Sequence, residues 1–186
     1  MKRNEVFTIP NILSMIRILL LPVVIYYYMY KQDMKTGVIM MFFCEITDFF
    51  DGFLARKLNQ VTKLGGILDP ISDKISQLVM CICVYSRFPL VRCLMYLFIG
   101  KEFISFIFGL FLINTDFDAR AKWFGKVNTV VFDIVLGLHM LWFDIPYNVS
   151  CILVCISAVL MVVSAIAYYS YWLRYLFSRP KKEIQP

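Results

Sequence analysis

Long apolar runs separated by short polar stretches dominate the pattern of this chain of 186 residues. Each run is close to the roughly 20 residues that a helix needs to cross the hydrocarbon core of a bilayer. Helices are the expected form, because lipid cannot satisfy exposed backbone groups. The pattern predicts six membrane-spanning helices, at residues 12–30, 36–55, 71–86, 89–113, 124–143 and 147–172. No repeat or low-complexity segment interrupts them, so we expect a single membrane domain over residues 1–186.

Composition supports a membrane protein over a water-soluble one. Hydrophobic residues make up 60% of the chain, whereas a soluble domain has about 45–50%. The six cysteines lie inside apolar segments and lack the spacing of a metal knuckle, so we interpret them as small hydrophobic residues. The fold class expected is therefore an all-α integral membrane bundle of six helices.

The distribution of basic residues predicts the orientation of this bundle. Of the 19 Lys and Arg residues, 12 lie at the two termini and in the second and fourth connections, and 4 lie in the other connections. The remaining 3, Arg17, Lys74 and Lys101, lie within predicted helices. By the positive-inside rule, both termini and the connection between the second and third helices are cytoplasmic. The net charge of +6 comes with no long basic patch, so nucleic acid is not an expected partner, whereas membrane lipids are.

The first residues of the chain predict a short interfacial helix. Polar residues are followed by Phe7, Ile9 and Pro10 ahead of the first apolar run, a composition suited to the cytoplasmic leaflet surface. The first run itself is long, contains Arg17 and lacks a small-residue cleavage site, so we do not interpret it as a cleavable signal.

Four aspartates flank the second connection, where charge is costly. Asp48 and Asp51 are three residues apart and Asp69 and Asp73 are four apart, which places each pair about 60° or about 40° apart on one helix face. Two adjacent antiparallel helices would bring all four to one depth, where unpaired carboxylates repel strongly. Divalent cations can neutralise them, and aspartate oxygens are the hard ligands that Mg²⁺ or Mn²⁺ prefers.

Small and basic residues accompany these carboxylates. Gly52, Ala55 and Gly65 would let a phosphate or a planar group approach the backbone closely, and Arg56 offers a bidentate donor to a phosphate oxygen. The alternative is a structural ion network, in which Asp69–Pro70 begins a helix and Asp73 pairs with Lys74 or Arg56. Carboxylates within membrane segments are functional by default, which favours a ligand site.

This region resembles the signature of the CDP-alcohol phosphotransferases. Their pattern is D-x-x-D-G-x-x-A-R, eight or nine residues, and then G-x-x-x-D-x-x-x-D. The chain agrees at all eight fixed positions, with eight residues between the halves: Asp48, Asp51, Gly52, Ala55, Arg56, Gly65, Asp69 and Asp73. Six spans with cytoplasmic termini are also the core of that family.

The resemblance implies a reaction and a role for each motif residue. An alcohol attacks the lipid-side phosphate of a CDP-linked donor, CMP leaves, and two divalent cations, Mg²⁺ or Mn²⁺, stabilise the pyrophosphate. It implies that Asp48, Asp51, Asp69 and Asp73 are metal ligands, with Asp73 also the catalytic base for the acceptor hydroxyl. The residues implied to line the CDP site are Asp48, Gly52, Ala55, Arg56, Gly65 and Asp69.

The start of the chain, from Thr8 to Pro22, is similar to the subgroup that makes phosphatidylglycerol phosphate and cardiolipin, which implies CDP-diacylglycerol as donor. Glycerol 3-phosphate is the acceptor we favour, on the overall short six-span pattern. Two features depart from the usual pattern of phosphatidylglycerol-phosphate synthases: Lys101-Glu102 replaces Arg-Glu, and the stretch from Gly125 reads GKVNT in place of G-K-x-K-T. The KVNT form is similar to eukaryotic-type cardiolipin synthases, which use phosphatidylglycerol. Either acceptor carries phosphate, and the candidates to bind it or the headgroup are Lys101, Lys126, Arg120, Lys122, Asn11 and Arg17.

Other interpretations stay open beside these. Arg17 could be a side chain that snorkels to the interface, and Lys101 could form a salt bridge with Glu102 or Glu45. His139 is interpreted as hydrogen-bonded structure rather than as a ligand. A distant alternative for the whole chain is an ion-coupled transporter, but such carriers are expected to show inverted repeats or broken helices, and this sequence shows neither. Family members are commonly homodimers, which nothing in the sequence indicates or excludes.

Overall fold

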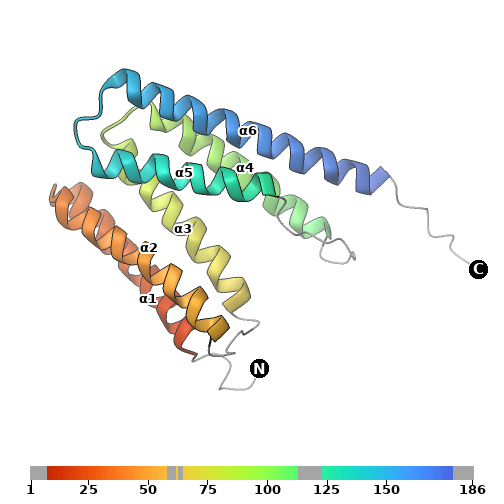
Figure 1. Ribbon diagram of the computed structural model, residues 1–186, viewed down its shortest axis with the longest axis horizontal. Coiled ribbons are helices and arrows are strands. Elements are labelled where there is room, and N and C mark those ends of the chain that lie inside the picture. Colours follow the sequence, from red (N-terminus) through yellow and green to blue (C-terminus); the bar gives the residue numbers. More distant parts are fainter. Residues whose placement is uncertain (1–7, 58–61, 63–64, 113–122, 178–186) are drawn as a thin grey trace, which may run out of the picture. The chain divides into compact units, whose positions relative to one another are not determined.

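The computed structural model describes residues 8–57, 62, 65–112 and 123–177, and in these residues all regular structure is helical (Figure 1). The helices form two compact units. The first contains residues up to Val91 together with Leu136–Phe143, and the second contains Arg92–Val135 and the chain from Asp144 onward. Each unit is described by itself.

The first unit is built on three long helices. α1 (Ile9–Ile25) continues into a five-residue π-helical turn, η2 (Tyr26–Tyr30), and is followed by α2 (Met34–Lys57) and α3 (Gly65–Tyr85). α1 packs against both α2 and α3 (Figure 1). Apolar side chains such as Leu21, Val24 and Cys44 are fully buried in this unit.

A tight turn joins the π-helical turn to α2. Gln32 adopts a left-handed backbone with φ 53°, and the Asp33 N–H donates to the carbonyl of Tyr27 at 3.0 Å, which closes the helix end. Asp33 then caps α2, since its carboxylate accepts from the hydroxyl of Thr36 at 2.6 Å and from its amide at 3.2 Å. The hydrogen bond from the Thr36 hydroxyl, and to a smaller extent the one from its amide, holds the pKa of Asp33 below its usual value.

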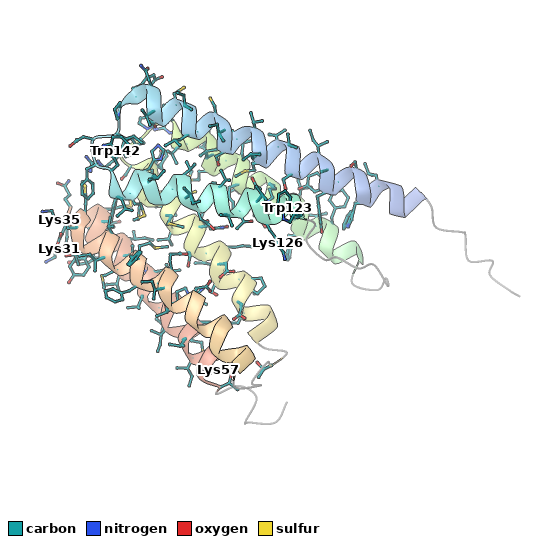
Figure 2. All side chains as sticks on the ribbon, in the orientation of Figure 1. Lys31, Lys35, Lys57, Trp123, Lys126 and Trp142 are labelled. Atoms are coloured by element: carbon teal, nitrogen blue, oxygen red, sulfur yellow. The ribbon has the colours of Figure 1, made fainter. Side chains whose placement is uncertain are left out.

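Close packing follows one turn into α2. A Cβ on Gly37 would lie 2.9 Å from Cβ and 3.2 Å from Cα of Tyr28, so only glycine lets α2 approach the π-helical turn so closely. At this end of the unit, the Arg87 guanidinium contacts Met34 Sδ and donates to the carbonyl of Phe143 at 3.2 Å. Figure 2 shows that Lys31 and Lys35 lie at one end of the α1–α2 pair and Lys57 at the other.

The second unit contains most of α4 (Val91–Leu112), the first part of α5 (Trp123–Leu141) and α6 (Tyr147–Phe177). Phe98 of α4 stacks on Phe132 of α5, with ring centroids 5.2 Å apart. Phe108 of α4 meets Trp172 of α6 edge to face at 4.2 Å. Aromatic contacts therefore hold α4 against both of its neighbours in this unit.

The predicted helices agree with the observed ones in number and order within the described residues, but several ends differ. α2 runs to Lys57, α3 begins at Gly65 and α6 reaches Phe177, whereas the sequence predicted ends near 55, 71 and 172. Apolar length marks only the hydrocarbon-crossing part of a helix, and backbone hydrogen bonding continues beyond it. Consequently Asp69–Pro70 lies inside α3 and does not begin it.

Within the part of the chain that the structure describes, two segments are long and apolar enough by themselves to cross a membrane, Asn11–Tyr30 and Tyr147–Ser170. The predicted interfacial helix falls largely on residues 1–7, outside the described residues. From Ile9 onward the chain belongs to α1, with Thr8 in an extended conformation at its N-cap and Pro10 in its first turn, so this part forms no separate helix.

Candidate active site

Three polar side chains interrupt the apolar surface of α1. Asn11, Ser14 and Arg17 follow one another at three-residue steps, and all three are buried. Their partners occur in the same order on the chain segment that leads into and along α3. Contacts in matching order mean that α1 and α3 run in the same direction, with their N-terminal ends at the site.

Asn11 fixes the start of α3. Its amide and the hydroxyl of Thr62 are 3.2 Å apart, and Thr62 Oγ accepts from the backbone N–H of Gly65 at 3.0 Å. A Cβ on Gly65 would lie only 2.8 Å from Asn11 Oδ1 and 3.2 Å from Thr62 Oγ1. The absence of a side chain at this motif glycine is therefore what lets α1 approach the start of α3.

Ser14 reaches the first aspartate of α3. Its hydroxyl donates to Asp69 Oδ1 at 3.1 Å, and the Asp69 backbone carbonyl accepts from the hydroxyl of Ser72 at 2.9 Å. Both serines are fully buried, whereas Asp69 is half-buried. The carboxylate of Asp69 is thus held from its interior side by a neutral donor.

Arg17 joins the two halves of the aspartate motif. Its Nη1 forms an ion pair with Asp48 of α2, lies 3.1 Å from Asp73 Oδ1 of α3, and donates to Ser72 Oγ at 3.3 Å. The side chain of Arg17 is 1% exposed, whereas Asp48 is 35% and Asp73 is 49% exposed. The arginine therefore supports the carboxylate pair from the interior, and part of each carboxylate stays accessible.

Among the described side chains, the charge balance around Arg17 is negative. One guanidinium contacts two carboxylates, and the carboxylate of Glu45 also lies within electrostatic reach of Asp73. Like charges at such separations repel unless further positive charge is present. The arrangement is therefore suited to attract a cation.

The donor set fits a hard divalent cation in its chemistry. Accessible carboxylate oxygens on Asp48 and Asp73, with Asp69 one turn away on α3, are the ligands that Mg²⁺ or Mn²⁺ takes in proteins. Among the described residues, no three His, Cys, Asp or Glu side chains are gathered closely enough to hold a metal ion. The side chain of Asp51 lies outside the described residues.

Several predicted site residues can be placed only in part. Asp51, Gly52, Ala55 and Arg56 belong to the helical backbone of α2, but their side chains are outside the described residues. Arg120 and Lys122 fall in residues 113–122, which are not described at all. The prediction that these residues bind metal, CDP or acceptor stays a prediction.

Two further predicted residues lie in the second unit. Lys101 Nζ forms a salt bridge with Glu102 at 2.8 Å, one of the alternatives that the sequence left open, and its backbone carbonyl accepts from the hydroxyl of Tyr169 at 3.0 Å. Lys126 is exposed in the first turns of α5, near Trp123 (Figure 2). His139 is fully buried in the first unit and meets Phe88 edge to face at 5.2 Å, as a structural histidine would.

One alternative that the sequence left open for Arg17 is wrong. Arg17 does not snorkel to an interface, because it is almost completely enclosed by protein. The alternative ion network paired Asp73 with Lys74 or Arg56; the structure shows an ion pair between Asp73 and Arg17, and the side chain of Arg56 lies outside the described residues. Ser14, Thr62 and Ser72 were missed entirely. The sequence pattern that could have indicated them is the three-residue spacing of Asn11, Ser14 and Arg17 on an otherwise apolar helix. Polar side chains on one face of such a helix indicate polar partners packed against that face.

Comparison with known proteins gives a consistent answer. Residues 7–172 match the family model of the CDP-alcohol phosphatidyltransferases. A protein of Aquifex aeolicus named CDP-diacylglycerol–glycerol-3-phosphate 3-phosphatidyltransferase is 31% identical over 90% of this chain and 93% of its own length. Proteins with the same name from Rickettsia felis (29% identity, 87% of this chain and 93% of theirs) and Salmonella choleraesuis (30%, 73% and 78%) are similar too. The chain therefore belongs to the CDP-alcohol phosphatidyltransferase family, a family of integral membrane enzymes.

Proposed function

We propose that this enzyme transfers a phosphatidyl group from CDP-diacylglycerol to glycerol 3-phosphate, releasing CMP and forming phosphatidylglycerol phosphate. The relatives that match most of the chain carry the name of this activity. The observation that carries the proposal is the ion-paired set of Asp48, Arg17 and Asp73, because it brings the two halves of the aspartate motif together from separate helices.

The reaction is a substitution at phosphorus. A hydroxyl oxygen of glycerol 3-phosphate forms a bond to the phosphorus that carries diacylglycerol, and the bond from that phosphorus to the bridging oxygen of the pyrophosphate breaks. The electron pair leaves with CMP, and the hydroxyl proton passes to a base. We assign Asp73 as the base, since it is the more exposed of the two carboxylates that Arg17 contacts, at 49% against 35% for Asp48.

The other motif residues bind and orient the donor. Asp48, Asp51 and Asp69, with Asp73, would hold two divalent cations, Mg²⁺ or Mn²⁺, which when bound supply the positive charge that the pyrophosphate needs. Gly52, Ala55 and Arg56 on the following turns of α2 are assigned to the cytidine diphosphate. Gly65 would serve the same site, in addition to its contact with Asn11.

The acceptor phosphate requires cations of its own. Lys101 is the first candidate, because its side chain is only 22% exposed and its charge is held in place by the salt bridge to Glu102. Lys126, Arg120 and Lys122 are assigned to the same role. The GKVNT stretch favours a second candidate function, a cardiolipin synthase that takes phosphatidylglycerol as acceptor.

The deciding experiment offers both acceptors to the purified enzyme. Protein in detergent receives CDP-diacylglycerol, Mg²⁺ or Mn²⁺, and either glycerol 3-phosphate or phosphatidylglycerol, and both CMP and the lipid product are identified. We expect CMP and phosphatidylglycerol phosphate with the first acceptor, and no CMP when a chelator removes the metal. Cardiolipin as the product would favour the cardiolipin synthase over the phosphatidylglycerol-phosphate synthase. Absence of CMP with either acceptor would refute the enzyme assignment.

Carboxylate variants test the site itself. Asp69→Asn and Asp73→Asn should each lower CMP release at least about 100-fold, the usual size of a lost acid–base or ligand contribution. Asp33→Asn is the matched control, because it removes the same charge from the exposed cap of α2 and asparagine caps helices equally well. Wild-type turnover in Asp69→Asn or Asp73→Asn would refute the roles assigned here.

The membrane arrangement we propose has six spans, both termini and the active site on the cytoplasmic side, and one domain. Counting α1 together with η2, the helices contain between 19 and 31 residues, enough to cross the hydrocarbon core. Lys57 at the site end and the excess of basic residues in the same connections support the orientation. Reporter fusions at the C-terminus test it, and a periplasmic or extracellular C-terminus would reverse it.

A further inference from the structure

We propose that Arg17 is an internal counter-ion of the aspartate motif: it balances Asp48 and Asp73 while no divalent cation is bound, and it opposes the cation that binds there. The inference rests on the proposed function in one respect, that the motif binds a divalent cation. It adds a role for a residue of the first helix, outside the signature, in setting how tightly that cation is held.

The contacts of Arg17 are those of a counter-ion. A single nitrogen, Nη1, touches carboxylates from two different helices, Asp48 of α2 and Asp73 of α3. The same nitrogen is 3.3 Å from the hydroxyl of Ser72, which is fully buried. Arginine suits such a position because its charge is permanent and its planar group presents several donors.

Burial separates this arrangement from an ordinary structural ion pair. Arg17 is 1% exposed, but its two partners are 35% and 49% exposed. An ion pair whose two partners are both enclosed loses the hydration of both charges, and no further cation can reach it. Here the positive charge is enclosed and the negative charges are accessible, so a second cation can reach the carboxylates that Arg17 already holds.

The charges predict the sign of the effect. A guanidinium and a divalent cation that share the same carboxylates repel each other, and protein around them screens this repulsion less than water does. Arg17 is not the only group that positions the carboxylates, because Asp48 and Asp73 lie on long helices and the Ser14 hydroxyl donates to Asp69. Removing the positive charge should therefore tighten metal binding, although it destabilises the metal-free protein.

Mn²⁺ binding to purified protein in detergent tests this, with free Mn²⁺ followed by electron paramagnetic resonance. We expect Arg17→Met and Arg17→Gln to bind Mn²⁺ at least tenfold more tightly than the wild type, and Arg17→Lys to bind with nearly wild-type affinity. Arg87→Met is the control, since Arg87 also joins parts of the first unit but at its other end. Its affinity for Mn²⁺ should not change.

Thermal unfolding in EDTA and in saturating Mn²⁺ gives an independent reading. Arg17→Met should unfold at a lower temperature than the wild type in EDTA and regain most of that loss in Mn²⁺. Arg87→Met should lose the same amount in both conditions, as a purely structural residue does. If Arg17→Met can be purified only with Mn²⁺ present, the inference is supported. If neither neutral variant folds with or without Mn²⁺, it is overturned.

Other outcomes separate this inference from the proposed reaction. Equal or weaker Mn²⁺ binding in Arg17→Met or Arg17→Gln overturns the counter-ion role even if the wild type releases CMP. Wild-type protein that binds no Mn²⁺ overturns it as well. Wild-type protein that binds Mn²⁺ and shows the expected Arg17 effects but releases no CMP would refute only the proposed reaction.

Discussion

Gly65→Ala is the most informative single substitution in this chain, because its neighbour Gly66 offers a control in the same helix turn. A methyl group at Gly65 would lie 2.8 Å from Asn11 Oδ1 and 3.2 Å from Thr62 Oγ1, closer than such atoms pack. The same group at Gly66 would meet nothing within 4 Å. Two substitutions of identical chemistry thus differ only in what surrounds the new methyl group.

The structure sets the size of the expected effect. Asn11 is buried, so rotating its amide away breaks the bond to Thr62 and leaves polar atoms without it, at a cost of about 1–3 kcal/mol. Replacing glycine by alanine in a helix returns about 0.5–1 kcal/mol. Gly65→Ala should therefore destabilise the protein by up to about 2.5 kcal/mol, whereas Gly66→Ala should stabilise it by up to about 1 kcal/mol.

Thermal unfolding of both variants in the same detergent measures the difference. Because both variants share the gain in helix propensity, they should differ by the cost of the lost bond, about 1–3 kcal/mol. For a chain of this size about 1 kcal/mol corresponds to roughly 2–4 °C, so their unfolding temperatures should differ by roughly 2–12 °C. CMP release should also fall in Gly65→Ala, since a shift at the start of α3 moves Asp69. If Gly65→Ala is as stable and as active as Gly66→Ala, then the contact among α1, Thr62 and α3 is not what requires glycine at this position.

Three further predictions concern other parts of the molecule. Gly37→Ala should destabilise the protein by about 1–3 kcal/mol, because its methyl group would meet Cβ and Cα of Tyr28. Gly100→Ala, with open space around it, should not, and equal unfolding temperatures of the two variants would contradict this close approach. Gln32→Gly should raise stability by about 1 kcal/mol by relieving a left-handed backbone at φ 53°, and a lower unfolding temperature would show that this conformation carries no strain. Lys101→Met should raise the KM for glycerol 3-phosphate roughly 10- to 100-fold, the value of a charged hydrogen bond, with kcat little changed; an unchanged KM would remove Lys101 from the acceptor site.

The apolar runs predicted the number and order of the described helices, since crossing a hydrocarbon core fixes both the length and the composition of a segment. It predicted their ends poorly at α2 and α3, where the charged motif is itself helical. The first turns of α3 contain Asp69 and no long apolar run, so the apolar pattern does not predict them as helix. The backbone hydrogen bonds of the folded chain show that α3 begins at Gly65.

The aspartates were predicted from their spacing, because two short intervals on helices suffice to place each pair on one face. The ion pairs and hydrogen bonds of Arg17 and Ser14 were not, because these contacts join different helices: Asp48 lies on α2, and the partners on α3 are more than fifty positions away. The sequence shows that a charge lies within the first helix, but which carboxylate it meets depends on how α1 packs against α2 and α3. Tertiary packing of this kind leaves only a weak trace in one sequence, here the polar repeat at Asn11, Ser14 and Arg17.

The π-helical turn at Tyr26–Tyr30 has a consequence for how chain length can vary among relatives. A one-residue insertion between Asn11 and Arg17 would rotate the side chains after it by about 100° relative to those before it, so Asn11, Ser14 and Arg17 could not all keep their partners. A π-helical turn already contains one residue more than an α-helical turn, so losing that residue restores an ordinary helix. Insertions and deletions in the first helix of related enzymes should therefore fall at or after this turn, and the stretch from Asn11 to Arg17 should keep its length.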